Sequence, residues 1–289
     1  MKPKKHADAV PTTQLDHVQR KAYLHSKGIN PNEPFQLGLL FPDSVGERDD
    51  QRYIPNDYAR SSLFTARSYR EPRKSLTQEK LFHLHETVSI LYTGIELRAI
   101  DDELVWLQIL NYGKNVALGE SFEFSIKDLV RDVGWNKSGR YYDKARECIS
   151  RLRANEVLAL NSKAYGRSGG ISLIANYEIL NDKEGKPMHY RVWIDANLVL
   201  LFAGNTFTGH SWITYRDLSP VARRLADYID SHKHPFPLKL EKFREMCGSK
   251  DLSLTSWRQT VKKACAEIEL NKIAKVATLN NGSICCVRE

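Results

Sequence analysis

Two short patterns in this sequence contain residue types that can break a phosphodiester bond. His83 and His85 flank one apolar residue, so both imidazoles would share one face of an extended strand. Two imidazoles on one face can hold a divalent metal ion. Tyr141 and Lys144 form a Tyr-x-x-Lys pattern, and a tyrosine beside a bound metal can attack a phosphodiester. Together the two patterns raise the hypothesis of a metal-dependent nickase.

The nickase hypothesis rests on a similarity to rolling-circle relaxases and replication nickases, and other features oppose it. A His-x-His pattern needs only two residues, and His232 and His234 repeat it. Tyr141 falls on the apolar stripe of its expected helix, where packing in the core is the default, and no third metal ligand stands out. The sequence also contains no P-loop and no glycine-rich dinucleotide loop. We therefore predict that the protein is not an enzyme and has no catalytic residue, metal site or cofactor.

The overall composition suits a cytoplasmic protein with a polyanionic partner. The 289 residues are enough for about two domains, and the net charge is +8. No run approaches the roughly 18 apolar residues that span a bilayer, and the basic start has no apolar stretch behind it. We therefore expect neither a membrane span nor a secretory signal. The five cysteines include no C-x-x-C pair, which favours reduced thiols over a zinc site or a disulfide framework.

The elements that would position the functional residues occur twice along the chain. In the first copy, helical spacing begins at Asp101, a second helix follows Ser125 with Gly134 as its C-cap, and a third covers residues 137–153. From Val157 the apolar spacing changes to the period of two that is typical of strands. Three helices followed by a strand, a turn and a strand is the pattern of a winged helix, a variant of the helix-turn-helix.

The same order returns in the C-terminal part of the chain. Ser219 and Pro220 begin a helix, a second helix ends at Gly248, and a third covers residues 254–268. Asn280-Asn281-Gly282 then predicts the turn of a β-hairpin. Equivalent positions lie 114 and then 116 residues apart, which favours an internal duplication. The aligned positions are Phe124 with Leu238, Ile126 with Leu240, Leu129 with Phe243, Val133 with Cys247, Gly134 with Gly248, Ala145 with Val261, Cys148 with Ala264, and Leu152 with Ile268.

These elements predict an α+β fold with two tandem winged-helix domains preceded by a flexible N-terminal arm. The arm is expected over residues 1–52, where prolines, lysines and acidic turn residues show no sustained helical or strand period. The first winged-helix domain is expected over residues 53–196 and the second over residues 197–289.

The third helix of each copy carries the residue types that bind DNA. Residues 137–153 contain six basic and two acidic side chains, a net charge of +4. The third helix of a helix-turn-helix enters the major groove, where arginine pairs with guanine, glutamine with adenine, and serine or threonine with either. A charged face is common on any exposed helix, but two equivalent basic helices favour DNA binding. The candidate DNA-binding residues are Lys137, Ser138, Arg140, Tyr142, Lys144, Thr255, Ser256, Arg258, Gln259, Lys262 and Lys263.

Several long segments give the chain a specific resemblance to the TrfA family of plasmid replication initiators, over roughly residues 35–289. The resemblance implies tandem winged-helix domains that bind directly repeated sites, the iterons, at a plasmid origin. It also implies opening of adjacent AT-rich DNA, single-stranded contacts there, recruitment of the host initiator and replicative helicase, and copy control through a monomer–dimer equilibrium. The segments that carry it are Pro55–Arg67, Tyr92–Arg98, Asp101–Trp106, Gly139–Leu152, Leu201–Gly204, Leu218–Arg224 and Pro237–Gly248.

An apolar segment in the expected arm is similar to a sliding-clamp-binding motif of such initiators. The family pattern Gln-Leu-x-Leu-Phe appears here with one additional residue before Phe41. The resemblance assigns clamp binding to Gln36, Leu37, Leu39 and Phe41; the alternative is an apolar patch that packs on the protein's own surface. A winged-helix transcriptional repressor is the alternative function, and the clamp-like segment favours replication over it.

Overall fold

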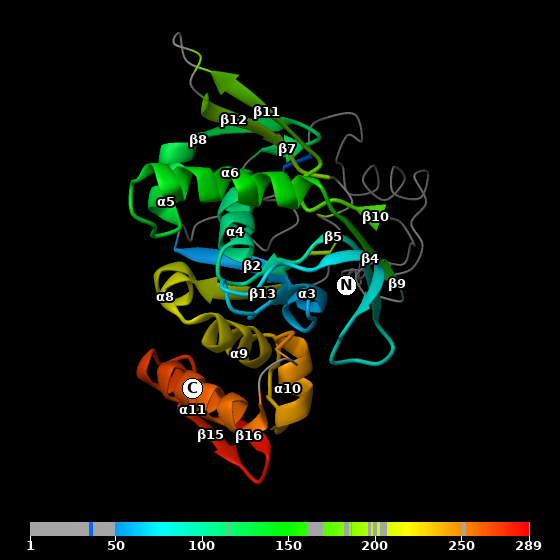
Figure 1. Ribbon diagram of the computed structural model, residues 1–289, viewed down its shortest axis with the longest axis vertical. Coiled ribbons are helices and arrows are strands. Elements are labelled where there is room, and N and C mark those ends of the chain that lie inside the picture. Colours follow the sequence, from blue (N-terminus) through cyan, green and yellow to red (C-terminus); the bar gives the residue numbers. More distant parts are fainter. Residues whose placement is uncertain are drawn as a thin grey trace, which may run out of the picture.

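The structure is a computed structural model, shown in Figure 1. It describes residues 35–36, 50–114, 116–160, 170–181, 185, 187–195, 198, 201–202, 207–249 and 253–288. Helices and small sheets alternate along these residues, so the expected α+β class is confirmed. The expected arm lies outside the described residues except for β1 (Phe35–Gln36), whose backbone pairs with β7 (Ala117–Leu118), and residues 50–52, which include the start of β2 (Gln51–Pro55). None of the helices in the described part of the chain combines the length and the apolar character needed to cross a membrane.

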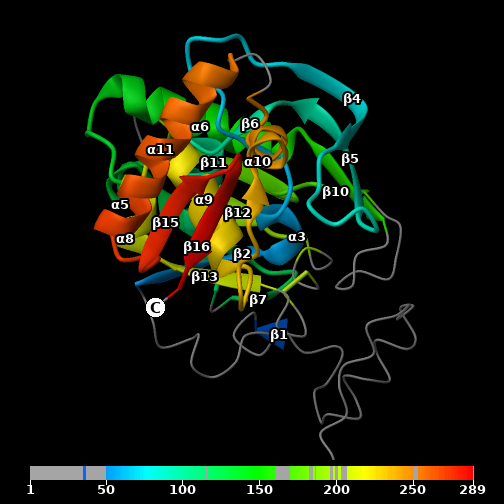
Figure 2. The same cartoon turned by 90° about the horizontal axis from the view of Figure 1, so that it is seen from below.

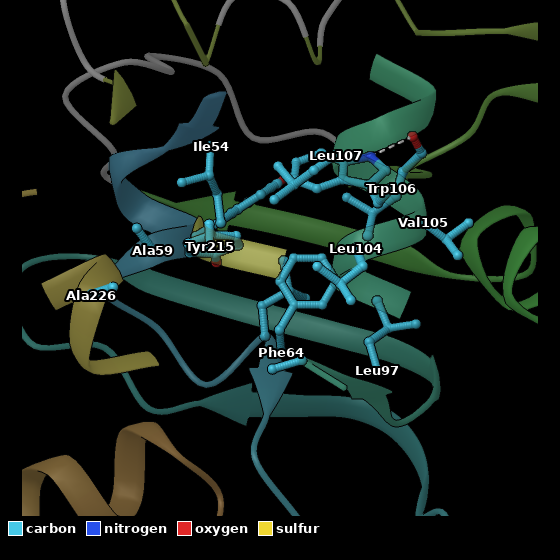
Figure 3. Close-up of a cluster of buried hydrophobic side chains, with 14 of the residues drawn as sticks. Ile54, Ala59, Phe64, Leu97, Leu104, Val105, Trp106, Leu107, Tyr215 and Ala226 are labelled. Atoms are coloured by element: carbon cyan, nitrogen blue, oxygen red, sulfur yellow. Dashed lines mark hydrogen bonds between the residues drawn. The ribbon is translucent and has the colours of Figure 1, made fainter. Parts of the chain in front are cut away.

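Helix α4 (Asp102–Tyr112) lies at the centre of the molecule and is buried from Asp102 to Ile109. The indole ring of Trp106 in this helix contacts Tyr58 and Phe64 at ring-centroid distances of 5.8 and 5.6 Å. Figure 3 shows this cluster and includes Tyr215 from the C-terminal part of the chain. A helix buried on all sides is normally apolar throughout, yet α4 also carries acidic and amide side chains that need buried partners.

The first copy of the repeated unit folds around one three-stranded sheet. Strand β8 (Ser121–Ser125) leads directly into α5 (Ile126–Asp132), which is followed by α6 (Gly139–Arg153). The hairpin of β11 (Asn176–Asn181) and β12 (Pro187–Trp193) then pairs with β8, in the order β11-β12-β8.

The second copy repeats this topology. Strand β14 (Leu238–Lys239) leads into α10 (Leu240–Met246), α11 (Leu254–Leu270) follows, and the hairpin β15 (Val276–Asn280) and β16 (Ser283–Val287) pairs with β14 in the order β14-β16-β15. A helix of equal length precedes each unit, namely α4 and α9 (Pro220–Asp230). Figure 1 shows α5 and α6 on one side of α4 and α9, and α10 and α11 on the other.

Local signals in the sequence correctly predicted several element ends. Ser125 accepts a hydrogen bond from Asp128 N, and Ser219 accepts one from Ala222 N, so both serines cap their helices. Asn281 and Gly282 both have positive φ, at 47° and 76°, as a type I′ hairpin turn requires. The aligned apolar side chains of the two copies are all buried, from Phe124 with Leu238 to Leu152 with Ile268.

A four-stranded sheet in the first half was not expected as a unit. It contains β10 (Gly170–Ile171), β9 (Glu156–Leu160), β5 (Ser89–Ile95) and β4 (Ser75–Leu81), in that order. Its strands come from segments separated by helices α4 to α6, so hydrophobic period alone could not indicate which strands pair.

The two copies are joined by a sheet and by packing, across the expected domain boundary at residues 196–197. Strand β2 pairs antiparallel with β13 (Phe207–Ser211), and helix α8 (Trp212–Asp217) follows directly. The indole of Trp212 donates to Asp132 O at 2.9 Å, at the end of α5. The boundary itself stays a prediction. Strand β2 before it nevertheless pairs with strand β13 after it.

A buried arginine network fixes α9 against the N-terminal half. Arg224 of α9 is fully buried, and its Nη1 lies 2.9 Å from Glu103 Oε1 of α4 and 2.6 Å from Asp227 Oδ2. Its Nη2 donates to the carbonyl oxygens of Ala59 and Ser61 at 2.7 and 2.8 Å, at the last residue of α3 (Asn56–Ala59) and just after the helix. Removing one partner of such a network leaves an uncompensated buried charge, which costs about 3–5 kcal/mol.

The buried imidazole of His210 extends this network. Its Nε2 lies 2.9 Å from Asp227 Oδ1 and its Nδ1 lies 3.0 Å from Asp230 Oδ2. Burial disfavours the imidazolium, but the two carboxylates outweigh burial and raise the pKa of His210 to about 9. The folded protein therefore holds His210 as a cation at neutral pH.

This pKa predicts that stability falls as the pH rises from about 6.5 to about 8.5. Below about pH 6.5 the stabilisation from the His210 cation is fully present. It is lost as the pH approaches 9, because the unfolded imidazole is already neutral while the folded one releases its proton. The expected loss in unfolding free energy over this range is about 2 kcal/mol. Burial and Asp227 raise the pKa of Glu103 to about 7, which acts in the same direction.

Urea unfolding at several pH values, followed by tryptophan fluorescence, measures this slope. The matched variant His210→Gln should be less stable at pH 6.5 and should show a clearly flatter dependence, because the titration of His210 no longer contributes. Equal slopes for the two proteins would contradict the assignment of a charged His210.

Candidate nucleic-acid interface

Helix α11 is held in place by one apolar face. Ser253 is its N-cap and accepts a hydrogen bond from Ser256 N at 3.2 Å. Trp257 is fully buried and donates from Nε1 to Leu240 O at 3.2 Å, which fixes α11 against the start of α10. Val261 and Ile268 continue the same buried face.

The opposite face of α11 is polar, exposed and positively charged. Residues 254–266 contain three basic side chains and no acidic one. Glu267 and Glu269 lie near the C-terminal end, where Glu267 accepts from Ser219 N and Glu269 accepts from Ala277 N. The sequence-predicted residues of this helix are therefore all on one accessible face: Thr255, Ser256, Arg258, Gln259, Lys262 and Lys263.

Helix α6 presents fewer available cations than the sequence suggests. Arg151 pairs with Asp102 at 3.0 Å, and Arg146 pairs with Asp143 at 2.7 Å. Lys144 Nζ lies 4.5 Å from the centre of the Trp135 ring and 3.8 Å from Asp101 Oδ2, so this candidate is engaged with its own domain.

The start of α6 keeps the exposed polar character expected of it. Lys137, Ser138 and Arg140 are exposed, and Ser138 occupies the N-cap position without a side-chain cap hydrogen bond. Tyr142 is half-buried. Tyr141 is also half-buried, with its ring 5.8 Å from that of Trp135, so the expected packing role of Tyr141 fits its position.

The expected strand does not extend through the histidine pair, because His83 forms only an isolated β-bridge with Ser61 and His85 lies in a bend. Strand β4 ends at Leu81, and His85 N donates to His83 Nδ1 at 3.0 Å, which curls the chain between the two residues. His83 Nε2 lies 3.7 Å from Asp57 Oδ1 on α3. Burial is the main cause that lowers the pKa of His83, which favours the neutral imidazole.

The histidines and the tyrosines belong to different parts of the molecule. His83 packs beside α3, and Tyr141 packs against Trp135, which follows α5. Figure 1 shows α3 and α5 on opposite sides of α4, so the two patterns do not form one site.

Among the described residues, one cluster has the spacing of metal ligands, formed by Asp101, Asp102 and Cys148. Both carboxylates are already paired, since Arg73 lies 2.9 Å from Asp101 and 2.7 Å from Asp102, and Arg151 also reaches Asp102. Burial raises the pKa of the Cys148 thiol well above its usual value, so it stays protonated. The cluster therefore works as an ion network that joins α4 to α6.

The sequence analysis did not identify a loop between β3 (Phe64–Thr65) and β4. Tyr69 in this loop is 65% exposed, and Arg70 beside it is exposed as well. The sequence could have indicated this loop, because Tyr69 stands between Arg67 and Arg70 in a segment without helical or strand period.

Comparison with known proteins gives the class and the family of the chain. A family model described as the TrfA protein matches residues 12–288. The plasmid replication initiator protein TrfA of Escherichia coli is 44% identical over 276 residues, which cover 95% of this chain and 71% of that relative. The protein is therefore a plasmid replication initiator. It belongs to the TrfA family, so the resemblance of its sequence segments is confirmed.

Two solved structures of domains 2 and 3 of RctB share the overall fold. One has a TM-score of 0.55 at 12% identity and covers 82% of this chain and 99% of that chain. The other has a TM-score of 0.50 at 13% identity and covers 77% of this chain and 91% of that chain. At such low identity the similarity extends to the fold alone.

Proposed function

We propose that this initiator binds directly repeated duplex sites at a plasmid origin through two recognition helices, α6 and α11, of tandem winged-helix domains. The observation that carries the proposal is the repeated topology. In both copies a strand leads into a short helix, a longer helix follows, and a hairpin pairs back on the first strand. That order matches the winged-helix arrangement, in which the longer helix enters the major groove.

The chemistry of the two helices supports DNA as the partner. The exposed start of α11 offers Arg258, Gln259 and Ser256, whose side chains match guanine, adenine and either base, respectively. Lys262 and Lys263 stand farther along the same face and suit phosphate contacts. On α6 the corresponding contacts come from Lys137, Ser138 and Arg140 at its start. Lys144 and Tyr142 contribute less, because both are partly buried.

Footprinting on the cognate origin tests the proposal. Two recognition helices in successive major grooves on one face of the duplex should protect roughly 20 bp per monomer, repeated along the origin. The DNA should stay covalently closed, because we propose no catalytic role for His83, His85 or Tyr142. Protection of only about 10 bp per monomer would show that one of the two units does not bind DNA.

Arg258→Ala and Lys262→Ala should weaken DNA binding in two different ways, one specific to the sequence and one not. If Arg258 reads a base, its loss costs about 1–3 kcal/mol and relaxes specificity at one position of the site. If Lys262 holds a phosphate, its loss weakens binding to all sequences alike and lowers the salt slope by about one. Fluorescence anisotropy on specific and random duplexes at several salt concentrations separates the two effects. Equal losses on both duplexes for both variants would mean that α11 clamps only the backbone.

The wider partnership of the initiator follows from its family and is part of the proposal. We propose that it acts in the cytoplasm, opens adjacent AT-rich DNA with single-stranded contacts, and recruits the host initiator and replicative helicase. We also propose that monomers bind iterons while homodimers limit copy number. Family membership supports each of these functions.

The sliding clamp is proposed as a further partner of the arm. The backbone of Gln36 lies in β1, whereas Leu37, Leu39 and Phe41 lie outside the described residues. In an extended segment Leu39 and Phe41 point the same way and can enter one apolar pocket. Titration of clamp with wild type and with Leu39→Ala/Phe41→Ala should show binding only for the wild type, with iteron binding unchanged. Clamp binding that survives the double substitution would favour packing of this segment on the protein itself.

A further inference from the structure

The loop of residues 66–74, here called the bridging loop, begins at the second copy of the repeated unit. Ala66 N donates to Cys247 O at 2.8 Å, at the end of α10. A side-chain carbon on Gly248 would come within 2.7 Å of Thr65 Cγ2, and Gly248 has a φ of +65°. The close approach and the left-handed backbone both require glycine here. The start of the loop is therefore locked to the turn that leads into α11.

The other end of the bridging loop is tied to the first copy. Arg73 pairs with Asp101 at 2.9 Å and with Asp102 at 2.7 Å, at the beginning of α4. Asp102 also pairs with Arg151 of α6, and Asp101 lies near Lys144 of the same helix. The bridging loop thus runs from the end of α10, the helix that precedes α11, to the side of α6.

The middle of the bridging loop is held from inside by a buried arginine. Arg98 is 2% exposed, and it donates to the carbonyl oxygens of Ser68, Glu71 and Pro72 at 2.8, 3.0 and 3.2 Å. The only acidic side chain of the loop, Glu71, pairs with Arg67 at 2.7 Å. These contacts fix the backbone of the loop, and the ion pair with Arg67 neutralises the charge of Glu71. The outer surface of the loop is therefore cationic.

Tyr69 and Arg70 form the outward tip of the bridging loop. Arg70 Nε donates to Tyr69 Oη at 3.3 Å, and the guanidinium carbon lies 5.7 Å from the centre of the ring. The hydrogen bond from Arg70 is the main cause that lowers the pKa of Tyr69, and the charge of Arg140 at the start of α6 adds to it. The charge of Arg140 therefore reaches Tyr69 at the tip of the loop.

The position of the loop relative to the two helices suits a third DNA contact. In Figure 1 the segment that leads into β4 lies between α6 above and α11 below. In Figure 2 the same segment lies on the side of the molecule where α6 and α11 are also seen. Two major-groove contacts one helical turn apart leave the intervening minor groove facing the protein. An arginine with an aromatic neighbour on a rigid loop matches a narrow, electronegative minor groove.

We propose that the tip of the bridging loop enters the minor groove between the two major-groove contacts, with Arg70 in the groove and Tyr69 bracing it. The inference rests on the proposed DNA-binding function and adds an element of specificity to it. It predicts a preference for A·T pairs at the centre of the site, because the 2-amino group of guanine obstructs that groove and lowers its negative potential.

Duplexes that differ only at the central base pairs test this contact. The centre is made of A·T, I·C or G·C pairs, because inosine lacks the 2-amino group and presents a minor groove like that of A·T. Wild type should bind the A·T and I·C centres alike and the G·C centre about tenfold more weakly. Arg70→Ala should bind all three centres alike. Arg70→Lys keeps the charge and should recover affinity without recovering the discrimination. Lys80→Ala, which removes an exposed charge from β4, serves as the matched control and should behave as wild type.

The outcomes separate this inference from the proposed function. Repeated protection of about 20 bp together with equal wild-type affinity for the three centres would overturn only the minor-groove contact. If Arg70→Lys recovers the full affinity and the wild type does not discriminate among the three centres, Arg70 contacts the phosphate backbone instead. Absence of repeated protection would refute the proposed function itself. Because Arg70 is exposed, thermal unfolding should be unchanged in its variants, and a lowered midpoint would count against a DNA-contact role.

Discussion

The structure depends on one buried cation, the guanidinium of Arg224. It reaches Glu103 on α4, Asp227 on its own helix, and backbone carbonyls next to α3, so a single side chain joins segments from both halves of the chain. Desolvation of such a group is costly, and the carboxylates and carbonyl oxygens offset that cost only because they lie in the directions of its two Nη groups. This requirement is directional, unlike apolar packing, and it fixes how α9 sits on α4. The second unit builds on α9, so the network sets the relation between α6 and α11.

Arginine is used in two opposite ways in this protein, and acidic neighbours decide which. Arg98 and Arg224 are buried, and each binds carboxylate and backbone oxygens that hold a segment in place. Arg140 and Arg258 are exposed on the proposed recognition helices, on faces where the sequence supplies few acids. The separation leaves the inner carboxylates neutralised and the outer face cationic. A DNA-binding surface needs this arrangement, because a carboxylate on that face would repel phosphate.

The two copies share topology but have acquired different surroundings. The sheet orders β11-β12-β8 and β14-β16-β15 are equivalent, and α5 and α10 end at glycines with positive φ. The first copy also packs against the sheet of β4, β5, β9 and β10. In its helix α6, Lys144 and Arg151 contact the carboxylates of Asp101 and Asp102 at the start of α4. The second copy keeps Arg258, Lys262 and Lys263 exposed.

The local features of this protein can be read directly from its sequence. Caps such as Ser125 and Ser219, the turn at Asn281 and Gly282, and the buried faces of α6 and α11 all depend on neighbours within a few residues, which a sequence displays directly. Contacts between distant segments determine the pairing of β2 with β13, the bridge between His83 and Ser61, and which cations remain available. Lys144 and Arg258 look alike in the sequence, but Asp101 lies 3.8 Å from Lys144 after folding. Whether a charge is exposed or paired depends on segments distant along the chain, and hydrophobic period carries no information about their approach.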